Sequence, residues 1–349
     1  MDLFEQIKTE GHEQVLFCSD PSSGLRAIIA IHSTQLGPAL GGCRMWSYPA
    51  FEEALSDVLR LSKAMTYKAA ISGLSLGGGK SVIWGDPKKD KTQKRLLAFA
   101  KHVASLGGRY IVAEDVGIGL SDIEMMRRIT PHVAGFSSEG GGSGDPSPAT
   151  AYGVFCGMRA CLEEVFGDDS FRGKSVAIQG VGKVGYALAR LLHQEGARLY
   201  ISDMDPERVA IVSRDFGAAP LLGHEIYRVD CDIFAPCALG GIVNERTVPR
   251  LGCRIVAGAA NNQLEDPKVA AMLGAANILY APDYVINAGG LINIAEELAG
   301  YVKERAYNKI LGIQDRLKAV FSLARKASLT SAEAADRLAE EGLGKGTDG

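Results

Sequence analysis

One stretch of the chain limits its fold more than any other. Residues 174–203, KSVAIQGVGKVGYALARLLHQEGARLYISD, run from an apolar β-branched segment through a glycine-rich turn and an amphipathic segment into a second apolar segment. The turn reads Gly180-x-Gly182-x-x-Gly185, and the second apolar segment ends in Asp203. This order of strand, glycine turn, helix, strand and acid is typical of a dinucleotide-binding βαβ unit, although the unit can also occur without a ligand.

The glycine turn predicts how a dinucleotide would bind. Glycines let the backbone approach the pyrophosphate, whose charge the helix N-terminus stabilises. The acid at the end of the next strand binds the ribose 2′-hydroxyl and repels a 2′-phosphate, so we expect NAD rather than NADP; Arg208 on the following helix weakens this preference only slightly. The expected cofactor contacts here are Gly180, Val181, Gly182, Lys183, Val184, Gly185 and Asp203.

The rest of the chain predicts a two-domain α/β protein. A glycine- and proline-rich stretch, 137–148, divides two series of alternating strands and helices. We expect one domain at 1–135 and a Rossmann-type dinucleotide-binding domain with a doubly wound parallel sheet at 145–328; a helix at about 330–349 would pack back on the first. Expected strands lie at 13–18, 25–32, 81–84, 109–114, 174–180, 197–203, 231–236, 254–259 and 278–282, and expected helices at 51–70, 92–106, 120–129 and 149–166.

Composition excludes several classes of protein. With 46% hydrophobic and 23% charged residues and a net charge of −3, the chain is an ordinary globular sequence, and nothing in its charge favours nucleic acid or an anionic membrane as a partner. No apolar run is long enough to cross a bilayer, and the N-terminus does not resemble a signal peptide. The seven cysteines include no C-x-x-C pair, and the six histidines form no metal-binding motif. We therefore expect a cytoplasmic protein with reduced thiols and no metal.

A second glycine-rich stretch, GLSLGGGKS at 73–81, superficially resembles a nucleotide phosphate loop. That motif needs a glycine at position 74, which is Leu, and it joins a strand to a helix. Here helical periodicity precedes the glycines and a β-prone run follows them, so the predicted order is helix, loop, strand. Lys80 therefore needs another role. Lys68 and Lys80 lie among small and apolar residues, unlike ordinary solvated lysines, and Asp115 ends a predicted strand, where catalytic groups often lie, although it could also be a turn or capping acid.

Six motifs carry a resemblance to a known family. They are GPALGGCRM (37–45), MTYKAAISGLSLGGGKSVI (65–83), AEDVG (113–117), GDPSPATAYGVF (144–155), AGAANNQL (257–264) and PDYVINAGGLIN (282–293). Together, from about residue 10 to residue 340, the sequence resembles the glutamate/leucine/phenylalanine/valine dehydrogenases. The resemblance implies NAD-dependent, reversible oxidative deamination of an L-amino acid to a 2-oxo acid and ammonium. It also implies a homo-oligomer whose N-terminal domain binds substrate and makes the oligomer contacts, with an active-site cleft between the domains.

The same resemblance implies roles for individual residues. Lys68 would bind the substrate α-carboxylate, and Lys80, neutral for part of the cycle, would activate the attacking water. Asp115 would carry protons to and from the amine. Gly41 and Gly42 would allow contacts between the backbone and the substrate, Met65 would border the substrate, and Thr150 and Asn262 would hold the nicotinamide carboxamide and ribose side of the cofactor. A non-catalytic NAD-binding protein and a phosphotransferase remain the rival hypotheses.

The expected substrate follows from four pocket positions. Glutamate-specific members carry a lysine before the paired glycines and a serine after NAGG, whereas this chain has Leu40 and Ile294. A buried carboxylate there would lose its hydration without gaining a cation, so we expect an apolar side chain unless both residues are merely core. Ala113 and Ile294 would narrow the pocket against a ring and favour L-leucine and other branched-chain amino acids. Leu291, which differs from the valine of many leucine enzymes, keeps L-phenylalanine and L-tryptophan as alternatives.

Overall fold

The computed structural model describes residues 3–344, which divide into two compact units. Unit 1 consists of the described parts of 1–145, 294–302 and 339–349, and unit 2 consists of 146–293 and 303–338. Residues 294–302 thus belong to unit 1, whereas the sequence prediction of a continuous second domain at 145–328 included them in that domain. The last residues of the expected C-terminal helix, 345–349, lie outside the described part of the chain.

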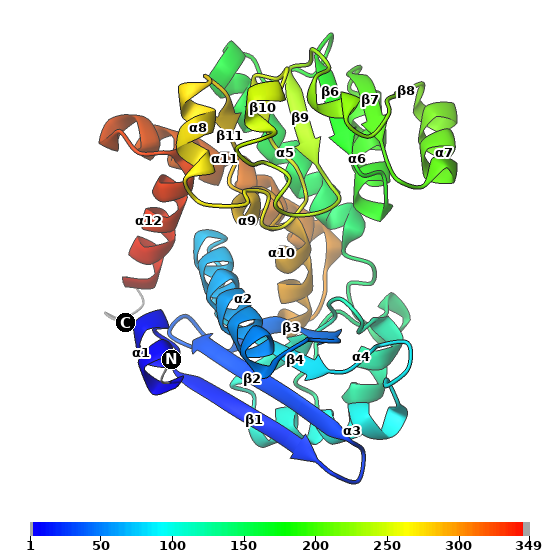
Figure 1. Cartoon of the computed structure of the whole chain (residues 1–349), viewed down its shortest axis with the longest axis vertical. Coiled ribbons are helices and arrows are strands. Elements are labelled where there is room, and N and C mark those ends of the chain that lie inside the picture. Colours follow the sequence, from blue (N-terminus) through cyan, green and yellow to red (C-terminus); the bar gives the residue numbers. More distant parts are fainter. Residues whose placement is uncertain (1–2, 345–349) are drawn as a thin grey trace. The chain divides into compact units, whose positions relative to one another are not determined.

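Unit 1 is built on a five-stranded sheet in the order β1-β2-β4-β3-β5 (Figure 1). β1 pairs with β2 and β2 with β4 in antiparallel fashion, whereas β3 runs parallel to both β4 and β5. The sheet is therefore mixed, and its three parallel strands end at the same edge. The strands are β1 (Gln14–Asp20), β2 (Leu25–Ser33), β3 (Ala39–Trp46), β4 (Gly77–Trp84) and β5 (Tyr110–Ala113).

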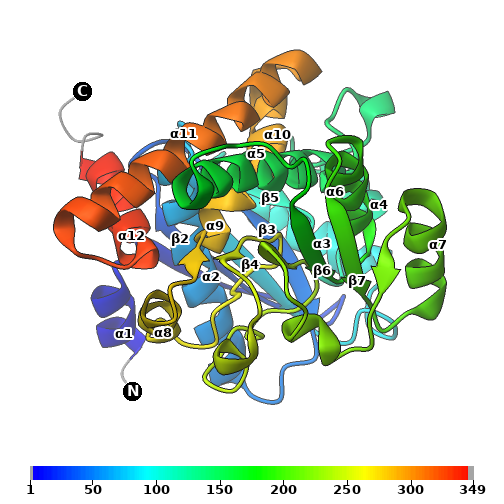
Figure 2. The same cartoon turned by 90° about the horizontal axis from the view of Figure 1, so that it is seen from above.

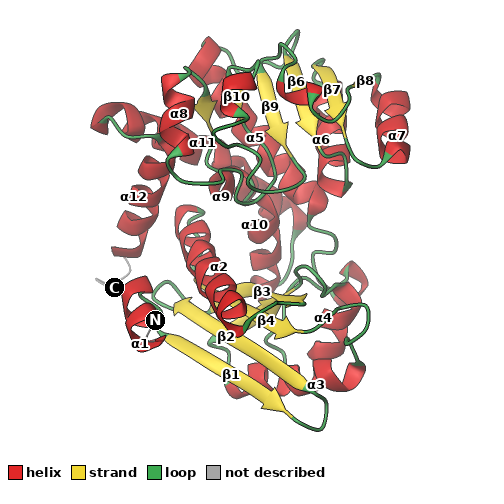
Figure 3. Cartoon of the chain, viewed as in Figure 1, coloured by secondary structure: helices red, strands yellow, loops and turns green. Residues whose placement is uncertain are grey.

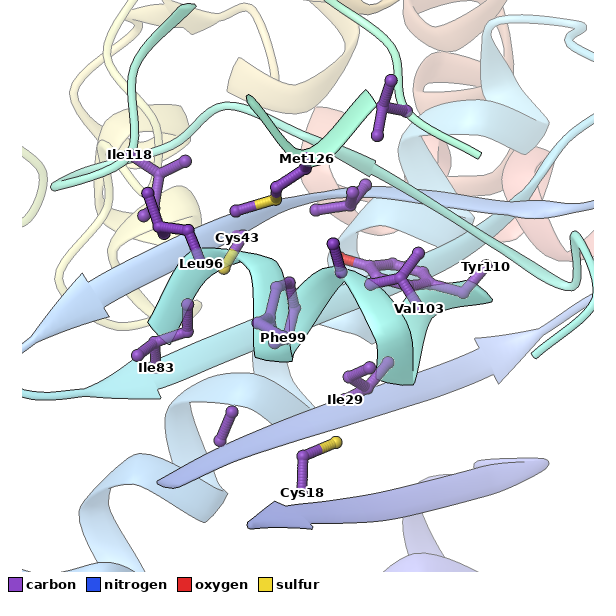
Figure 4. Packing of buried hydrophobic residues seen from close by; sticks show 14 of the residues in the cluster. Cys18, Ile29, Cys43, Ile83, Leu96, Phe99, Val103, Tyr110, Ile118 and Met126 are labelled. Carbon is purple, nitrogen blue, oxygen red and sulfur yellow. The ribbon is translucent and has the colours of Figure 1, made fainter. Parts of the chain in front are cut away.

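Helices cover both faces of this sheet. The helices are α1 (Leu3–Glu10), α2 (Phe51–Ile71), α3 (Gln93–Ser105) and α4 (Leu120–Arg127). On one face, Val58 and Leu59 of α2 pack on Ile28 and Val82. On the other, α3 and α4 enclose a second apolar cluster, in which Phe99, Val103 and Met126 meet side chains of the strands (Figure 4). Because side chains alternate along a strand, even-numbered residues of β3 and β4 face α2.

Two sequence predictions for unit 1 were wrong. The strand Ala39–Trp46 was not expected, and the three glycines of 77–79, expected to form a loop, lie inside β4. Glycine has a low β-propensity, so local sequence gave no strand signal at either place. Close packing explains the glycines: a Cβ on Gly77 would lie 1.9 Å from the Ser33 carbonyl oxygen, and one on Gly78 would lie 2.0 Å from the Thr66 nitrogen in α2.

Unit 2 contains a six-stranded sheet in the order β11-β10-β9-β6-β7-β8, and every pairing is parallel. This confirms the parallel, doubly wound sheet that the sequence predicted. Figure 3 labels strands β6 to β10 of this sheet. The strands are β6 (Ser175–Gln179), β7 (Arg198–Ser202), β8 (Ala219–Pro220), β9 (Ile233–Pro236), β10 (Ile255–Val256) and β11 (Leu279–Tyr280).

The helices of unit 2 begin with α5, which lies against both α6 and α11 (Figure 2). Gly157 of α5 allows this packing, because a Cβ there would lie 2.8 Å from Leu317 of α11. The bounds of these and the later helices are α5 (Ser147–Phe166), α6 (Lys183–Gln194), α7 (Pro206–Phe216), α8 (Val269–Ala275), α9 (Asp283–Ile286), α10 (Gly289–Ala295), α11 (Lys303–Ala327) and α12 (Ser331–Gly344). Residues 294–295 of α10 and 339–344 of α12 belong to unit 1. Short 3₁₀ helices lie at Glu225–Tyr227 and Val248–Arg250 in unit 2 and at Ser138–Gly140 and Glu296–Ala299 in unit 1.

The seven cysteines are all free thiols. Within residues 3–344, no helix is both long and apolar enough to pass through a lipid bilayer. In the same described part of the chain, no group of three or more His, Cys, Asp or Glu side chains is arranged to hold a metal ion.

Candidate active site

Lys80 projects from the middle of β4 toward the face that α2 covers. It pairs with Ala30 of β2, and Val82, two residues further along the same strand, packs against α2. Its side chain is only 8% exposed, and its ammonium nitrogen lies 2.6 Å from Oδ2 of Asp115. The lysine that the sequence singled out is therefore enclosed and joined directly to the acid predicted to act with it.

Asp115 follows the end of β5, and its side chain is 20% exposed. The lack of a side chain at Gly42 leaves room for Asp115, because a Cβ on Gly42 would lie 2.8 Å from Cβ of Asp115. Burial raises the pKa of Asp115, but the positive charges of Lys80 and Arg44 outweigh burial and lower the pKa below its ordinary value. Asp115 is therefore a carboxylate at neutral pH.

Arg44 is a contact that sequence reasoning missed. Its Nε lies 3.1 Å from Oδ2 of Asp115, the same oxygen that Lys80 contacts, and its Nη1 lies 2.9 Å from Oδ2 of Asp57 in α2. Side chains alternate along a strand, so Arg44, two residues after Gly42 on β3, faces the same side of the sheet as Gly42. That alternation would have placed Arg44 near the site. The signal was lost because the strand itself was not predicted.

The glycines near Lys80 serve packing rather than phosphate binding. They lie within a strand, not before a helix, so the phosphate-loop hypothesis fails on geometry. A Cβ on Gly79 would lie 2.7 Å from the Tyr110 ring, and one on Gly41 would lie 1.6 Å from the Gly79 carbonyl oxygen. The Tyr110 hydroxyl donates to the Gly41 carbonyl at 2.8 Å and lies 3.0 Å from Oγ of Ser81. A larger residue would therefore not fit at position 41 or 79, and the substrate contacts expected at Gly41 and Gly42 stay a prediction.

The other predicted substrate residues of unit 1 lie on several elements. Met65 and Lys68 are one turn apart on α2, and both are half-buried. Leu40 is 2% exposed and pairs with Gly78 and Ile111. Ala113 pairs with Gly42. Leu40 and Ala113 therefore face the same side of the sheet as Lys80. Ile294, in the segment of α10 that belongs to unit 1, lies 3.7 Å from the Cβ position of Gly135. Leu291, buried in the same helix, belongs to unit 2.

In unit 2, the glycine turn joins β6 to α6 as predicted. Gly180 has a left-handed backbone, with φ of 95°, and a Cβ on Gly185 would lie 2.1 Å from the Gly180 carbonyl oxygen. Gly182 is the N-cap of α6, and a Cβ there would meet only the Arg208 side chain, at 3.6 Å. A cavity of about 520 Å³ opens at this point, lined by Val181, Gly182, Lys183, Tyr186 and Arg208. Two cations beside a helix N-terminus fit a dinucleotide pyrophosphate.

The other predicted cofactor residues of unit 2 are dispersed. Asp203 is brought to the glycine turn: its carboxylate accepts from the Val181 N–H at 2.8 Å and from the Asp205 N–H at 2.9 Å. Val184 lies in the first turn of α6. Thr150, in the first turn of α5, donates to the Pro146 carbonyl at 3.0 Å. Asn262 is exposed with a left-handed backbone, φ of 51°, and its carbonyl accepts from the Gly241 N–H.

Comparison with known proteins agrees with this geometry. Residues 12–132 match the family model described as Glu/Leu/Phe/Val dehydrogenase, dimerisation domain, and 141–207 and 205–339 match the Glutamate/Leucine/Phenylalanine/Valine dehydrogenase model. The chain is 54% identical to leucine dehydrogenase of Geobacillus stearothermophilus over 98% of this chain and 93% of that protein. It is 47% identical to phenylalanine dehydrogenase of Caldalkalibacillus thermarum over the same shares.

A solved structure extends the likeness to three dimensions. The crystal structure of L-tryptophan dehydrogenase from Nostoc punctiforme superposes with a TM-score of 0.89 at 45% identity, covering 99% of this chain and 100% of that one. The two family models match in order over most of the sequence, and the matched residues include Lys80 and Gly180. This chain therefore belongs to the Glu/Leu/Phe/Val dehydrogenase family.

Proposed function

We propose that this amino-acid dehydrogenase uses NAD to deaminate L-leucine and other branched-chain L-amino acids reversibly to their 2-oxo acids and ammonium. The observation that carries the proposal is the enclosed Lys80–Asp115 pair, with its two charged atoms 2.6 Å apart. The higher identity to a leucine dehydrogenase, 54%, than to a phenylalanine dehydrogenase, 47%, supports the branched-chain substrate.

The proposed mechanism assigns one task to each side chain. Lys68 binds the substrate α-carboxylate and so orients the Cα–H bond. The glycine turn with Lys183 and Arg208 would hold NAD, which would supply the hydride acceptor for the substrate Cα. Lys80, in its neutral form, removes a proton from the water that attacks the resulting imine carbon. Asp115 takes up protons from Lys80 and supplies them to the departing amine, which leaves as ammonium.

The proposed NAD site lies in unit 2. The cavity beside Lys183 and Arg208 is suited to the pyrophosphate, and Asp203 keeps a negative charge next to it. A 2′-phosphate would meet that charge, which supports NAD over NADP. The proposal further assigns the nicotinamide side to Thr150 and Asn262.

The proposed pocket for the substrate side chain is apolar. Its proposed lining in unit 1, formed by Leu40, Ala113 and Ile294, is at most 9% exposed. None of these side chains can pair with a second carboxylate, so binding glutamate would cost several kcal/mol of lost hydration. Selection among apolar side chains is weaker, about 1–3 kcal/mol per methylene. L-Tryptophan and L-phenylalanine are the second candidates because of the TM-score of 0.89 and the 47% identity to enzymes with those names.

NADH formation with L-leucine, L-valine, L-phenylalanine, L-tryptophan and L-glutamate, followed by absorbance, tests this function. We expect the largest kcat/KM with L-leucine and none with L-glutamate. A Lys80→Met variant should lose turnover while binding NADH as tightly as the wild type. An L-phenylalanine-led profile would overturn the pocket argument alone, whereas no turnover with any amino acid would overturn the enzyme assignment.

We also propose that the chain is a cytoplasmic homo-oligomer, with unit 1 making the contacts between subunits. The description of its matching family model as a dimerisation domain supports this. Light scattering of the purified protein measures the assembly mass. A mass of 37.0 kDa, that of a single chain, would contradict the proposal.

A further inference from the structure

Arg44 lies between two carboxylates on the face of unit 1 that carries Lys80. Its Nε contacts Oδ2 of Asp115 at 3.1 Å, and its Nη1 contacts Oδ2 of Asp57 at 2.9 Å. Asp57 is held in turn by the Tyr48 hydroxyl, which donates to Oδ2 at 2.7 Å, and by Arg60, which contacts Oδ1 at 3.0 Å. The Arg44 side chain is 24% exposed, so its charges are only partly screened by water. Asp57 thus anchors one end of a guanidinium whose other end touches the proposed proton carrier.

Two positive charges contact the Asp115 carboxylate, and the Arg44 guanidinium supplies one of them. Lys80 reaches it from β4 and Arg44 from β3, both at the same oxygen, Oδ2. The Cys43 thiol and the Tyr110 hydroxyl also lie near it, and burial raises the pKa of both: to about 12 for Cys43 and well above the ordinary value for Tyr110. They are neutral over the working pH range, so Lys80 and Arg44 supply the positive charge that balances Asp115.

These two cations differ in one chemical respect. The proposed reaction requires Lys80 to be neutral when it accepts the proton of water. At that moment a poorly hydrated Asp115 carboxylate would be left without its lysine partner, and burial alone would favour its protonation. A guanidinium does not lose its proton in proteins, so Arg44 carries its charge throughout the cycle.

We propose that Arg44 is a positioning residue for deamination, which keeps Asp115 ionised and aligned while Lys80 is neutral, and that Asp57 and Tyr48 hold Arg44 in place for this task. The inference rests on the proposed catalytic role of Asp115. It adds a residue that acts through that acid rather than by touching the substrate.

The test compares three variants of the full-length protein. Arg44→Gln removes the charge, Arg44→Lys retains it, and Arg60→Gln removes an exposed charge from the same Asp57 without touching Asp115. Loss of a nearby cation strengthens proton binding by the Lys80–Asp115 pair, so the acidic limb of the kcat/KM pH profile should move to higher pH by about one unit in Arg44→Gln. It should stay within about 0.3 unit of the wild type in Arg44→Lys and in Arg60→Gln.

A second readout does not depend on turnover. The carboxyl carbon resonance of Asp115 in aspartate-labelled protein, assigned by its loss in Asp115→Asn, reports protonation directly. We expect its midpoint to rise in Arg44→Gln and to be restored in Arg44→Lys. An unchanged midpoint and an unchanged acidic limb in folded Arg44→Gln would overturn the inference, as would equal shifts in Arg44→Gln and Arg44→Lys.

These readouts separate the inference from the function itself. Wild-type protein without amino-acid dehydrogenase activity would refute the proposed function, while the resonance would still show whether Arg44 controls Asp115. If Arg44→Gln fails to fold, Arg44→Lys carries the test: a large shift of its acidic limb would refute the claim that charge is what matters.

Discussion

Breaking the Lys80–Asp115 pair gives a quantitative test of the site. Asp115→Asn leaves the Lys80 ammonium, 8% exposed, without its acid, and also deprives Arg44 of one partner. Lys80→Met has a smaller effect, because Asp115 keeps its contact with Arg44 at 3.1 Å. The two single variants should therefore differ in stability although each removes one partner of the same pair.

The magnitude follows from the geometry. At a separation of 2.6 Å, an effective dielectric constant of about 20 gives a gross attraction of about 6 kcal/mol, most of which the lost hydration of both ions offsets. Removing one partner of a buried pair costs about 3–5 kcal/mol, and the 20% exposure of Asp115 places this pair at the low end. We expect losses of about 3 kcal/mol for Asp115→Asn and about 1.5 kcal/mol for Lys80→Met.

The double variant completes the cycle. The double variant has no charge at position 80 or 115, so neither position leaves a buried charge without its partner. Its free energy of unfolding should be only about 2 kcal/mol below that of the wild type, a loss well below the sum of the losses in the single variants. Urea unfolding of the four proteins at one protein concentration and neutral pH measures these free energies. Single-variant effects that add to within about 0.5 kcal/mol would refute the reasoning, since they would mean that the two groups do not interact.

Three further predictions concern packing, pH and cofactor. Gly78→Ala should destabilise the protein by about 3 kcal/mol or prevent folding, because its Cβ would lie 2.0 Å from the Thr66 nitrogen, whereas Gly274→Ala in α8, with nothing within 4 Å, should stabilise by about 0.5 kcal/mol in urea unfolding. Burial lowers the pKa of His32 to about 4 from 6.5, so its neutral form stabilises the fold above pH 6.5; that contribution, about 3 kcal/mol, should fall away between pH 6.5 and 4. Unfolding free energies of His32→Gln should vary correspondingly less over this range, and an equal slope would contradict the assignment. Asp203→Ala should weaken NADH binding about tenfold and raise affinity for NADPH relative to NADH in fluorescence titrations; an unchanged ratio would show that this acid does not select the cofactor.

Local patterns were sufficient to predict much of unit 2. The run from β6 to Asp203 combines a β-branched strand, a glycine turn and an amphipathic helix, each specified by neighbouring residues. The parallel sheet agrees with this pattern, because parallel strands need a crossover connection, which the helical segments between the strands supply. The family motifs likewise predicted that Lys80 and Asp115 both belong to the catalytic site.

The sequence could not reveal what long-range packing decides. The strand Ala39–Trp46 and the start of β4 contain glycines, which in sequence are typical of a loop. No larger residue fits there because backbone atoms of neighbouring segments lie too close to the glycines. Because that strand was missed, Arg44 seemed unremarkable, and its place beside Asp115 appeared only once β3 and β5 were paired in register. Hydrophobic periodicity and turn chemistry are local and can be read along a chain. The register between distant strands depends on tertiary contacts, which decide the neighbours of each charge.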